Sequence, residues 1–173
     1  MKKTIKSVML LMLCAALLVV SACGMKSFPK DTTAKQITDA IKESVGNPPQ
    51  SIIFYGENGK TLNEIEMSLW ADGQYVKCEE FSLIEDYSLV YSGDNTTYEI
   101  SVIKVKEDAD PQKIVEVFER RKLTLSNGDK AAYDPDFKNL IDNSRIIIEG
   151  KFVILLITPN NDAAIKTIKE LKK

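Results

Sequence analysis

RIIIEGKFVILLI, residues 145–157, determines the architecture of this chain more than any other segment. Two apolar runs flank Gly150 and Lys151, and this pattern predicts a β-hairpin with strands at 145–149 and 152–158. Neither run alternates between apolar and polar residues, so both faces of these strands are expected to be buried. The rest of the chain therefore has to cover two faces of a sheet.

A second hairpin is predicted upstream of the first. Residues 81–91 and 98–105 alternate over much of their length, and Gly93-Asp94-Asn95 lies between them as a turn. The alternation of apolar and polar residues shifts by one position between Val102 and Ile103. This shift indicates either a bulge or burial of both faces of the strand.

Helix signals occupy the segments between and around the hairpins. Thr33 and Gln36 form a capping-box pattern before apolar residues at helical spacing, and this predicted helix ends at Gly46. Asp110-Pro111 and Asp134-Pro135 each combine an N-cap with a proline in the first turn, and predict helices that end near Gly128 and Asn143. A final helix is predicted after Pro159-Asn160, with these residues facing inward: Ala164, Ile165, Ile168 and Leu171.

The segment from 48 to 80 carries weaker patterns. Residues 52–55 predict a short strand, and Glu57-Asn58-Gly59 a turn. Leu62, Ile65 and Leu69 have helical spacing, although Ile65, Met67 and Leu69 also fit a strand. We expect a helix here.

These elements predict an α+β fold: an antiparallel sheet built from two hairpins, each followed by a helix packed on one face, with an N-terminal helix after a flexible tether. The simplest packing places both of these helices on the same face. The second face then needs cover from the helix at 33–45, from the helix at 134–143, from a partner protein or from a second copy. Residues 98–121 and 152–172 both run strand, turn and helix, through internal duplication or through coincidence of a common motif.

The N-terminus carries an export signal. Lys2, Lys3 and Lys6 precede an uncharged run at 8–20, whose 13 residues are fewer than the about 20 needed to span a bilayer. The run closes on the lipobox residues Val20, Ser21 and Ala22, followed by Cys23. The sequence therefore predicts a signal peptide at 1–22, diacylation of Cys23, a lipidated tether at 23–32 and a single domain at 33–173. The expected location is the outer face of the cytoplasmic membrane.

Composition excludes several classes of function. Loss of residues 1–22 removes three lysines and changes the net charge from −2 to −5, and no basic run interleaved with aromatic residues suggests nucleic acid binding. The chain has no histidine, which excludes Ser-His-Asp and Cys-His nucleophile systems and histidine-based zinc sites. Cys78 is the one thiol left after export and lipidation, so it is a buried apolar residue or an intermolecular link.

Candidate chemistry is sparse. Carboxylates gather at Glu79-Glu80, at Glu85-Asp86 and at Glu107-Asp108-Asp110, where acid–base chemistry or calcium binding competes with capping and solvation. Aromatic residues offer either a ligand-stacking surface or ordinary packing: Tyr87, Tyr91, Tyr98 and, at a pocket mouth, Trp70. We predict no catalytic residue, no cofactor and no metal.

Three segments resemble a known family, in that family's order. They are Tyr98-Glu99-Ile100-Ser101-Val102-Ile103-Lys104-Val105-Lys106 with the helix through Phe118-Glu119-Arg120-Arg121, then Tyr133-Asp134-Pro135, then Ile148-Glu149-Gly150-Lys151-Phe152-Val153 with the terminal helix. Over roughly residues 83–173, and in the lipobox and first helix, the sequence resembles the domain-of-unknown-function 4358 family of Gram-positive bacterial lipoproteins. Its motifs are strand and turn patterns, so the resemblance implies no functional residue. Residues 48–80 lie outside it.

The expected function follows from location more than from chemistry. We predict a membrane-anchored extracytoplasmic lipoprotein that acts as a binding or protein-interaction module of the cell envelope, with an envelope protein or a second copy as partner. The alternatives are a small carboxylate- or tyrosine-dependent envelope enzyme and a structural subunit of a membrane complex.

Overall fold

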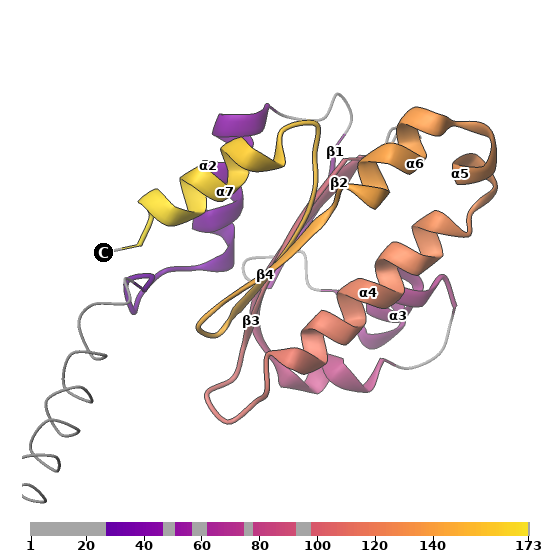
Figure 1. The fold of residues 1–173 in the computed structure, drawn as a ribbon. Coiled ribbons are helices and arrows are strands. Elements are labelled where there is room, and N and C mark those ends of the chain that lie inside the picture. Colours follow the sequence, from indigo (N-terminus) through magenta and orange to yellow (C-terminus); the bar gives the residue numbers. More distant parts are fainter. Residues whose placement is uncertain (1–26, 47–50, 57–61, 75–77, 93–97, 173) are drawn as a thin grey trace, which may run out of the picture.

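The structure is a computed structural model that describes residues 27–46, 51–56, 62–74, 78–92 and 98–172. These residues form an α+β fold around a five-stranded antiparallel sheet, as predicted (Figure 1). The elements in chain order are α2 (Ala34–Val45), β1 (Ser51–Tyr55), α3 (Glu64–Asp72), the 3-10 helix η1 (Glu79–Leu83), β2 (Ile84–Ser92), β3 (Glu99–Val105), α4 (Gln112–Ser126), α5 (Asp129–Tyr133), α6 (Pro135–Asp142), β4 (Arg145–Glu149), β5 (Phe152–Ile157) and α7 (Asn161–Glu170).

Local capping explains where the helices start. Thr33 and Gln36 form the predicted capping box of α2. Asn63 caps α3 by accepting hydrogen bonds from Ile65 and Glu66, which confirms the helix expected in this segment. Asp134 caps α6 by accepting from the backbone of the next turn, with Pro135 at its start.

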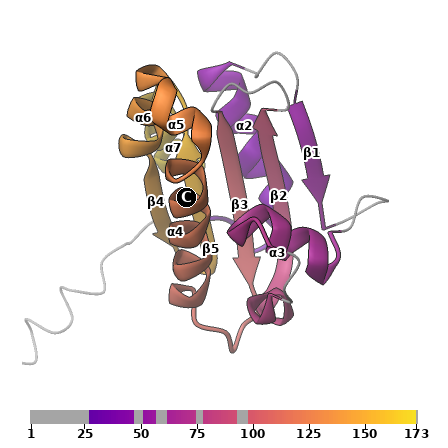
Figure 2. The ribbon, with the colours of Figure 1, turned by 90° about the vertical axis from the view of Figure 1, so that its right-hand side faces the viewer.

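The strand order is β1-β2-β3-β5-β4, which places both hairpins side by side (Figure 2). β3 is buried on both faces and its register with β5 is regular across Val102 and Ile103, so the shift in alternation there reflects two-sided burial. The irregularity lies in β2 instead, between Ile84 and Asp86. β2 also begins at Ile84 and not at Phe81, because residues 79–83 form the 3-10 helix η1.

Two apolar cores lie on opposite sides of the sheet (Figure 1). On one side, which we call the α4 face, α3 and α4 cover alternate residues of the central strands, among them Ile103, Val153 and Leu155. On the other, the α2/α7 face, α2 and α7 cover the intervening residues Ile100 and Ile154. The second face of the sheet is thus covered by α2, the helix predicted at 33–45. This was one of the four possible covers left open by the sequence.

Each hairpin is followed by a helix packed on one face, but α4 and α7 lie on opposite faces and not on the same one. The reason is that β3 and β5 are apolar on both sides, so one helix layer leaves a face uncovered. β3 and β5 are antiparallel neighbours, so the rotation that superposes the pair β2-β3 on the pair β4-β5 has its axis normal to the sheet. Such a rotation leaves each helix on the side of the sheet where it started. The two strand-strand-helix units therefore have opposite hands, which favours coincidence over internal duplication.

The first described residues pack against the rest of the domain. Phe28 packs edge-on against Phe152 with ring centroids 5.2 Å apart, and the backbone N–H of Ala34 donates to Asp86 at 2.7 Å. The second half of the segment predicted as a tether therefore contacts the α2/α7 face. The lipobox, Cys23 and the predicted turns at 57–59 and 93–95 lie outside the described residues. Among the described residues, no helix is both long and apolar enough to cross a bilayer.

Candidate functional site

A buried ion pair joins the sheet to α4 on the α4 face. Glu99, the first residue of β3, has 2% of its surface exposed, and Arg121 of α4 lies 2.9 Å from its carboxylate. The Ser101 hydroxyl donates to the same carboxylate at 2.7 Å. Glu99 and Ser101 share this face because residues two apart in a strand point the same way. The buried carboxylate thus has both a cation and a neutral donor.

Arg121 makes further contacts through its guanidinium group. It donates to the backbone carbonyl of Trp70 at 3.0 Å, and it lies 5.6 Å from the ring centroids of both Trp70 and Tyr91. Trp70 is 5% exposed and packs edge-on against Phe118, so it belongs to the core and not to a pocket mouth. Its indole N–H has no hydrogen-bond partner among the residues that the structure describes. Burial raises the pKa of Tyr91, against the opposing effect of the nearby Arg121.

Arg120, the neighbouring residue, organises a second polar cluster. Its guanidinium donates to Asp72 at 2.7 Å and to Glu80 at 3.0 Å, so one side chain links α4 to α3 and η1. The Cys78 thiol donates to the other Glu80 oxygen at 3.3 Å. Burial favours a higher pKa for Glu80, but hydrogen bonds from Arg120, from the backbone and from Cys78, together with the Arg120 charge, outweigh it and lower that pKa.

The environment of Cys78 makes it a poor nucleophile. Its surface is 3% exposed, and burial together with the hydrogen bond to Glu80 raises the pKa of the thiol to about 11. Because the thiolate is the reactive form, both effects oppose disulfide formation and metal binding. Of the two roles open from the sequence, the structure favours the buried apolar one.

Both arginines therefore act within the fold. Their partners lie on α3, η1 and β3, which are far apart in sequence, and Thr124 adds a hydrogen bond from α4 to the Ala71 carbonyl at 3.1 Å. The two clusters hold α4 against α3, η1 and β3.

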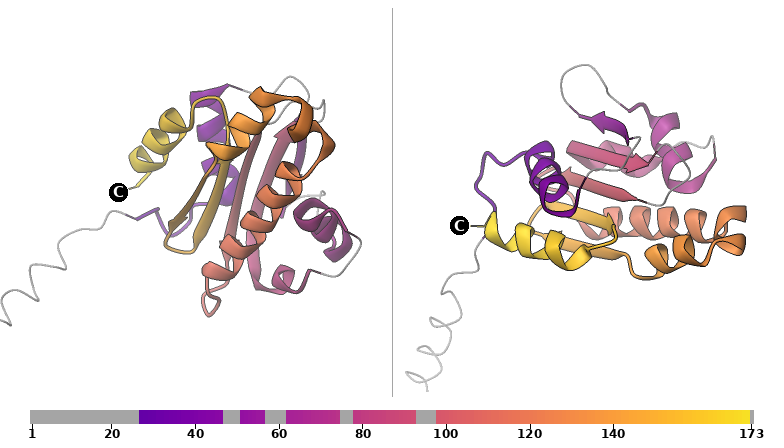
Figure 3. Two further views of the ribbon diagram at one scale, coloured as in Figure 1. Left: turned by 45° about the vertical axis from the view of Figure 1, so that its right-hand side comes forward. Right: turned by 90° about the horizontal axis from the view of Figure 1, so that it is seen from above.

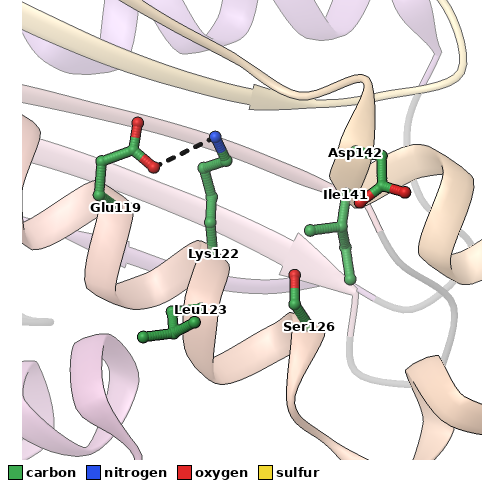
Figure 4. Close-up of a pocket in the computed structure, with 6 residues that line it drawn as sticks. All are labelled: Glu119, Lys122, Leu123, Ser126, Ile141 and Asp142. Carbon is green, nitrogen blue, oxygen red and sulfur yellow. Dashed lines mark ion pairs between the residues drawn. The ribbon is translucent and has the colours of Figure 1, made fainter.

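A surface groove of about 510 Å³ lies between α4 and α6 (Figure 4). Leu123, which is 60% exposed, and the buried Ile141 supply apolar contact, and the other lining residues are Glu119, Lys122, Ser126 and Asp142. The Lys122 ammonium lies 3.2 Å from Glu119 and is turned away from the Ser126 hydroxyl. The groove can accept an apolar group beside polar ones, but it holds no Ser-Lys nucleophile pair.

A smaller depression of about 250 Å³ lies at the start of α7. Its lining is rich in amides and includes Asn139, Asn143, Asn160 and Arg145. Asn160 caps α7 through the backbone N–H of Ala163, and Asn161 donates to the Asn143 carbonyl at 2.9 Å. These amides are largely engaged in tying α7 to the α6–β4 connection.

The carboxylates considered from the sequence do not converge. Glu80 binds Arg120, and Glu85 pairs with Lys104 at 2.7 Å. Asp110 accepts from the backbone N–H of Gln112 at the start of α4, as expected of a capping residue. The described residues contain no group of three or more Cys, Asp and Glu side chains placed to hold a metal ion.

The three tyrosines do not form one surface. Tyr87 and Tyr91 lie on the α4 face, and Tyr98 lies on the α2/α7 face. Tyr87 accepts a hydrogen bond from the backbone of Leu62, and Tyr98 donates to the carbonyl of Gly46 at the end of α2. Burial raises the pKa of Tyr98 to about 12. Packing therefore accounts for these residues, and a single aromatic ligand platform is not present.

Part of the region that forms these clusters matches a known family model. Residues 80–158, from η1 through β5, match the model of a family described as a domain of unknown function, DUF4358. This segment, 79 of the 173 residues, is similar to that family. Searches of curated proteins and of solved structures found no match.

The DUF4358 segment contains both halves of the buried ion pair, Glu99 and Arg121, but not Trp70 or Asp72 on α3. Sequence reasoning gave none of Glu99, Arg120 and Arg121 a role. A signal was present for Glu99, because a carboxylate at alternate spacing with Ser101 and Ile103 faces the core and requires a buried partner.

Proposed function

We propose that this protein is an extracytoplasmic lipoprotein, anchored in the membrane through lipid on Cys23, that acts as a binding module of the cell envelope. The observation that carries the proposal is the segment 1–23: a basic start, a 13-residue apolar run and Val20-Ser21-Ala22-Cys23. Two acyl chains hold a protein on a membrane durably, whereas one gives marginal binding.

The arrangement of the described side chains supports binding over the enzyme alternative. Glu80 and Glu85 each pair with a cation, and Glu99 is enclosed with Arg121 and Ser101. General acid–base catalysis needs titratable groups that face a shared substrate position. In the described residues these carboxylates instead stabilise contacts between elements.

The anchor is tested with Cys23→Ala in the full chain. We expect the wild-type protein to sediment with membranes and to carry label from a radioactive fatty acid, and the variant to lose the label and its stable membrane association. Cys78→Ala is the matched control, because Cys78 is buried and should leave both readouts unchanged. Fatty acid label that persists in the Cys23→Ala variant would contradict the proposal.

The binding role is tested by chemical cross-linking in intact cells, followed by affinity capture of the anchored protein. We expect a small number of envelope proteins that are absent when the Cys23→Ala variant is captured. Recovery of the same background from both forms would contradict an envelope-binding role.

A further inference from the structure

β4 presents an unpaired strand edge. It lies at one end of the strand order, and within the described part of the chain it pairs with β5 alone; Figures 2 and 3 show it at the margin of the sheet. Its central residues are Ile146, Ile147 and Ile148, and Ile148 is 45% exposed. Proteins commonly protect such edges with lysine, proline or a bulge. None of these interrupts the three isoleucines.

The hairpin geometry shows which backbone groups face outward. Glu149 and Phe152 flank the two-residue turn Gly150-Lys151, and in such a turn the flanking pair is hydrogen-bonded. Pairs alternate along an antiparallel ladder, so Ile147 bonds to β5 while Ile146 and Ile148 direct their N–H and C=O groups away from it. No turn or loop hydrogen bond among the described residues takes up these groups.

We propose that β4 pairs antiparallel with β4 of a second copy of this chain, in a register centred on Ile147. In this register Ile146 faces Ile148 of the other copy, and these are the residues whose backbone groups point outward. Two hydrogen-bonded pairs then form across the edge, and the two five-stranded sheets join into one.

The charges at the two ends of β4 favour a second copy as the partner, and they favour one register of pairing over others. Arg145 and Glu149 lie at the two ends of β4, so antiparallel pairing centred on Ile147 places each beside its opposite charge in the partner copy. A register centred on Ile146 or Ile148 satisfies the outward backbone groups but separates these charges. The other edge strand, β1, contains no charged residue and offers no such selection.

This pairing is compatible with two membrane anchors, although it does not require them. The two-fold axis of the pair is normal to the sheet, so the α2/α7 faces of both copies lie on the same side. Phe28, five residues after Cys23, packs on that face through Phe152. Phe28 of each copy therefore lies on the same side of the joined sheet, as two lipid anchors inserted into a single leaflet require.

Cysteine cross-linking in native membranes tests the register with the full chain. Ile147→Cys places two thiols opposite each other in a non-hydrogen-bonded pair, where the Cα atoms are about 4.5 Å apart and a disulfide can form. Ile148→Cys is the matched control. The Cα atoms of residue 148 in the two copies would lie about 8–9 Å apart, beyond the about 7 Å that a disulfide spans. With a mild oxidant we expect a disulfide-linked dimer from Ile147→Cys and at most a trace from Ile148→Cys.

A charge exchange tests the same register independently. In the Ile147→Cys chain, Arg145→Glu places like charges opposite each other, and we expect the cross-linked dimer to fall several-fold. Adding Glu149→Arg restores opposite charges across the edge and should restore the dimer. Lys113→Met is a control, because Lys113 pairs with Glu116 within α4 at 3.2 Å and neither residue belongs to β4, so the cross-linked dimer should be unchanged.

Three results would overturn the inference. They are equal cross-linking at positions 147 and 148, failure of the charge exchange to restore the dimer, and a disulfide between Ile147→Cys and a different protein. The anchor is judged by membrane release of Cys23→Ala, so either idea can fail while the other stands.

Discussion

Arg121→Met removes the cation from the buried Glu99 and should be the most destabilising single change in the polar clusters. Glu99 is 2% exposed and the Arg121 side chain 13%, so water replaces the lost partner poorly. Breaking one partner of a buried pair costs about 3–5 kcal/mol, a large part of the about 5–15 kcal/mol by which a domain is stable. Glu99→Met should cost a similar amount, because it leaves the guanidinium unpaired.

The double variant Glu99→Met/Arg121→Met separates a coupled pair from two independent contributions. Apolar replacement of a whole buried pair is often neutral, so the double variant should be more stable than either single variant. Its remaining cost comes from the Ser101 hydroxyl, which loses its acceptor, and from the Trp70 carbonyl, which loses its donor, at about 1 kcal/mol each.

Urea unfolding followed by far-ultraviolet circular dichroism measures these differences. With a slope of about 2 kcal/mol per molar urea, each single variant should lower the midpoint by about 2 M. Lys113→Met is the control, because its ion pair with Glu116 at 3.2 Å is exposed and should contribute less than about 1 kcal/mol. The reasoning is refuted if the double variant loses the sum of the two single losses, or if Arg121→Met behaves like Lys113→Met.

Four further predictions concern other parts of the fold. In a chain with Cys14→Ser and Cys23→Ser, Cys78 of the folded protein should react with a thiol reagent at pH 8 at least about 100-fold more slowly than Cys78 of the protein unfolded in urea. The reason is that a rise in the thiol pKa from 9.0 to about 11 leaves about a hundredth of the thiolate. Equal rates in both solvents would contradict the burial of Cys78. The same shift means that folding favours the neutral thiol, so stability should fall as the pH rises from 9 to 11, and the fall should be smaller in Cys78→Ala. Phe118→Ala should lower the free energy of unfolding by about 3–5 kcal/mol, because the ring is fully buried against Trp70, and a loss below 1 kcal/mol in urea unfolding would show that α4 is not held by this core. Asp134→Ala should cost about 1 kcal/mol through loss of the α6 cap, whereas Asp134→Asn, which keeps an acceptor oxygen, should be close to wild type in thermal unfolding.

Local signals predicted most elements of this fold correctly. Gly150-Lys151 between two apolar runs, the capping box at Thr33 and the pair Asp134-Pro135 each depend on residues within one turn, and each element formed where expected. The η1 segment was mistaken for strand because Phe81 continues the apolar alternation of β2.

Features that depend on distant residues could not be predicted in the same way. Helical periodicity shows that α4 and α7 have an apolar stripe, but not which face of the sheet receives it. Arg121 is 22 residues from Glu99 and 51 from Trp70, so their contacts follow from packing. The docking of Phe28 on Phe152 joins residues still farther apart, and a polar, proline-containing segment gave no sign of it.

The contact between Phe28 and Phe152 limits the clearance beneath a lipidated domain. Phe28 is the fifth residue after Cys23, and at about 3.4 Å per residue step a fully extended segment spans about 17 Å. A small folded domain is about 30 Å across, so it cannot pass between the bilayer and the part of the α2/α7 face near Phe152. If Cys23 is lipidated as proposed, that region is screened from folded proteins, and a folded binding partner has to approach from the α4 face or along the rim of the sheet.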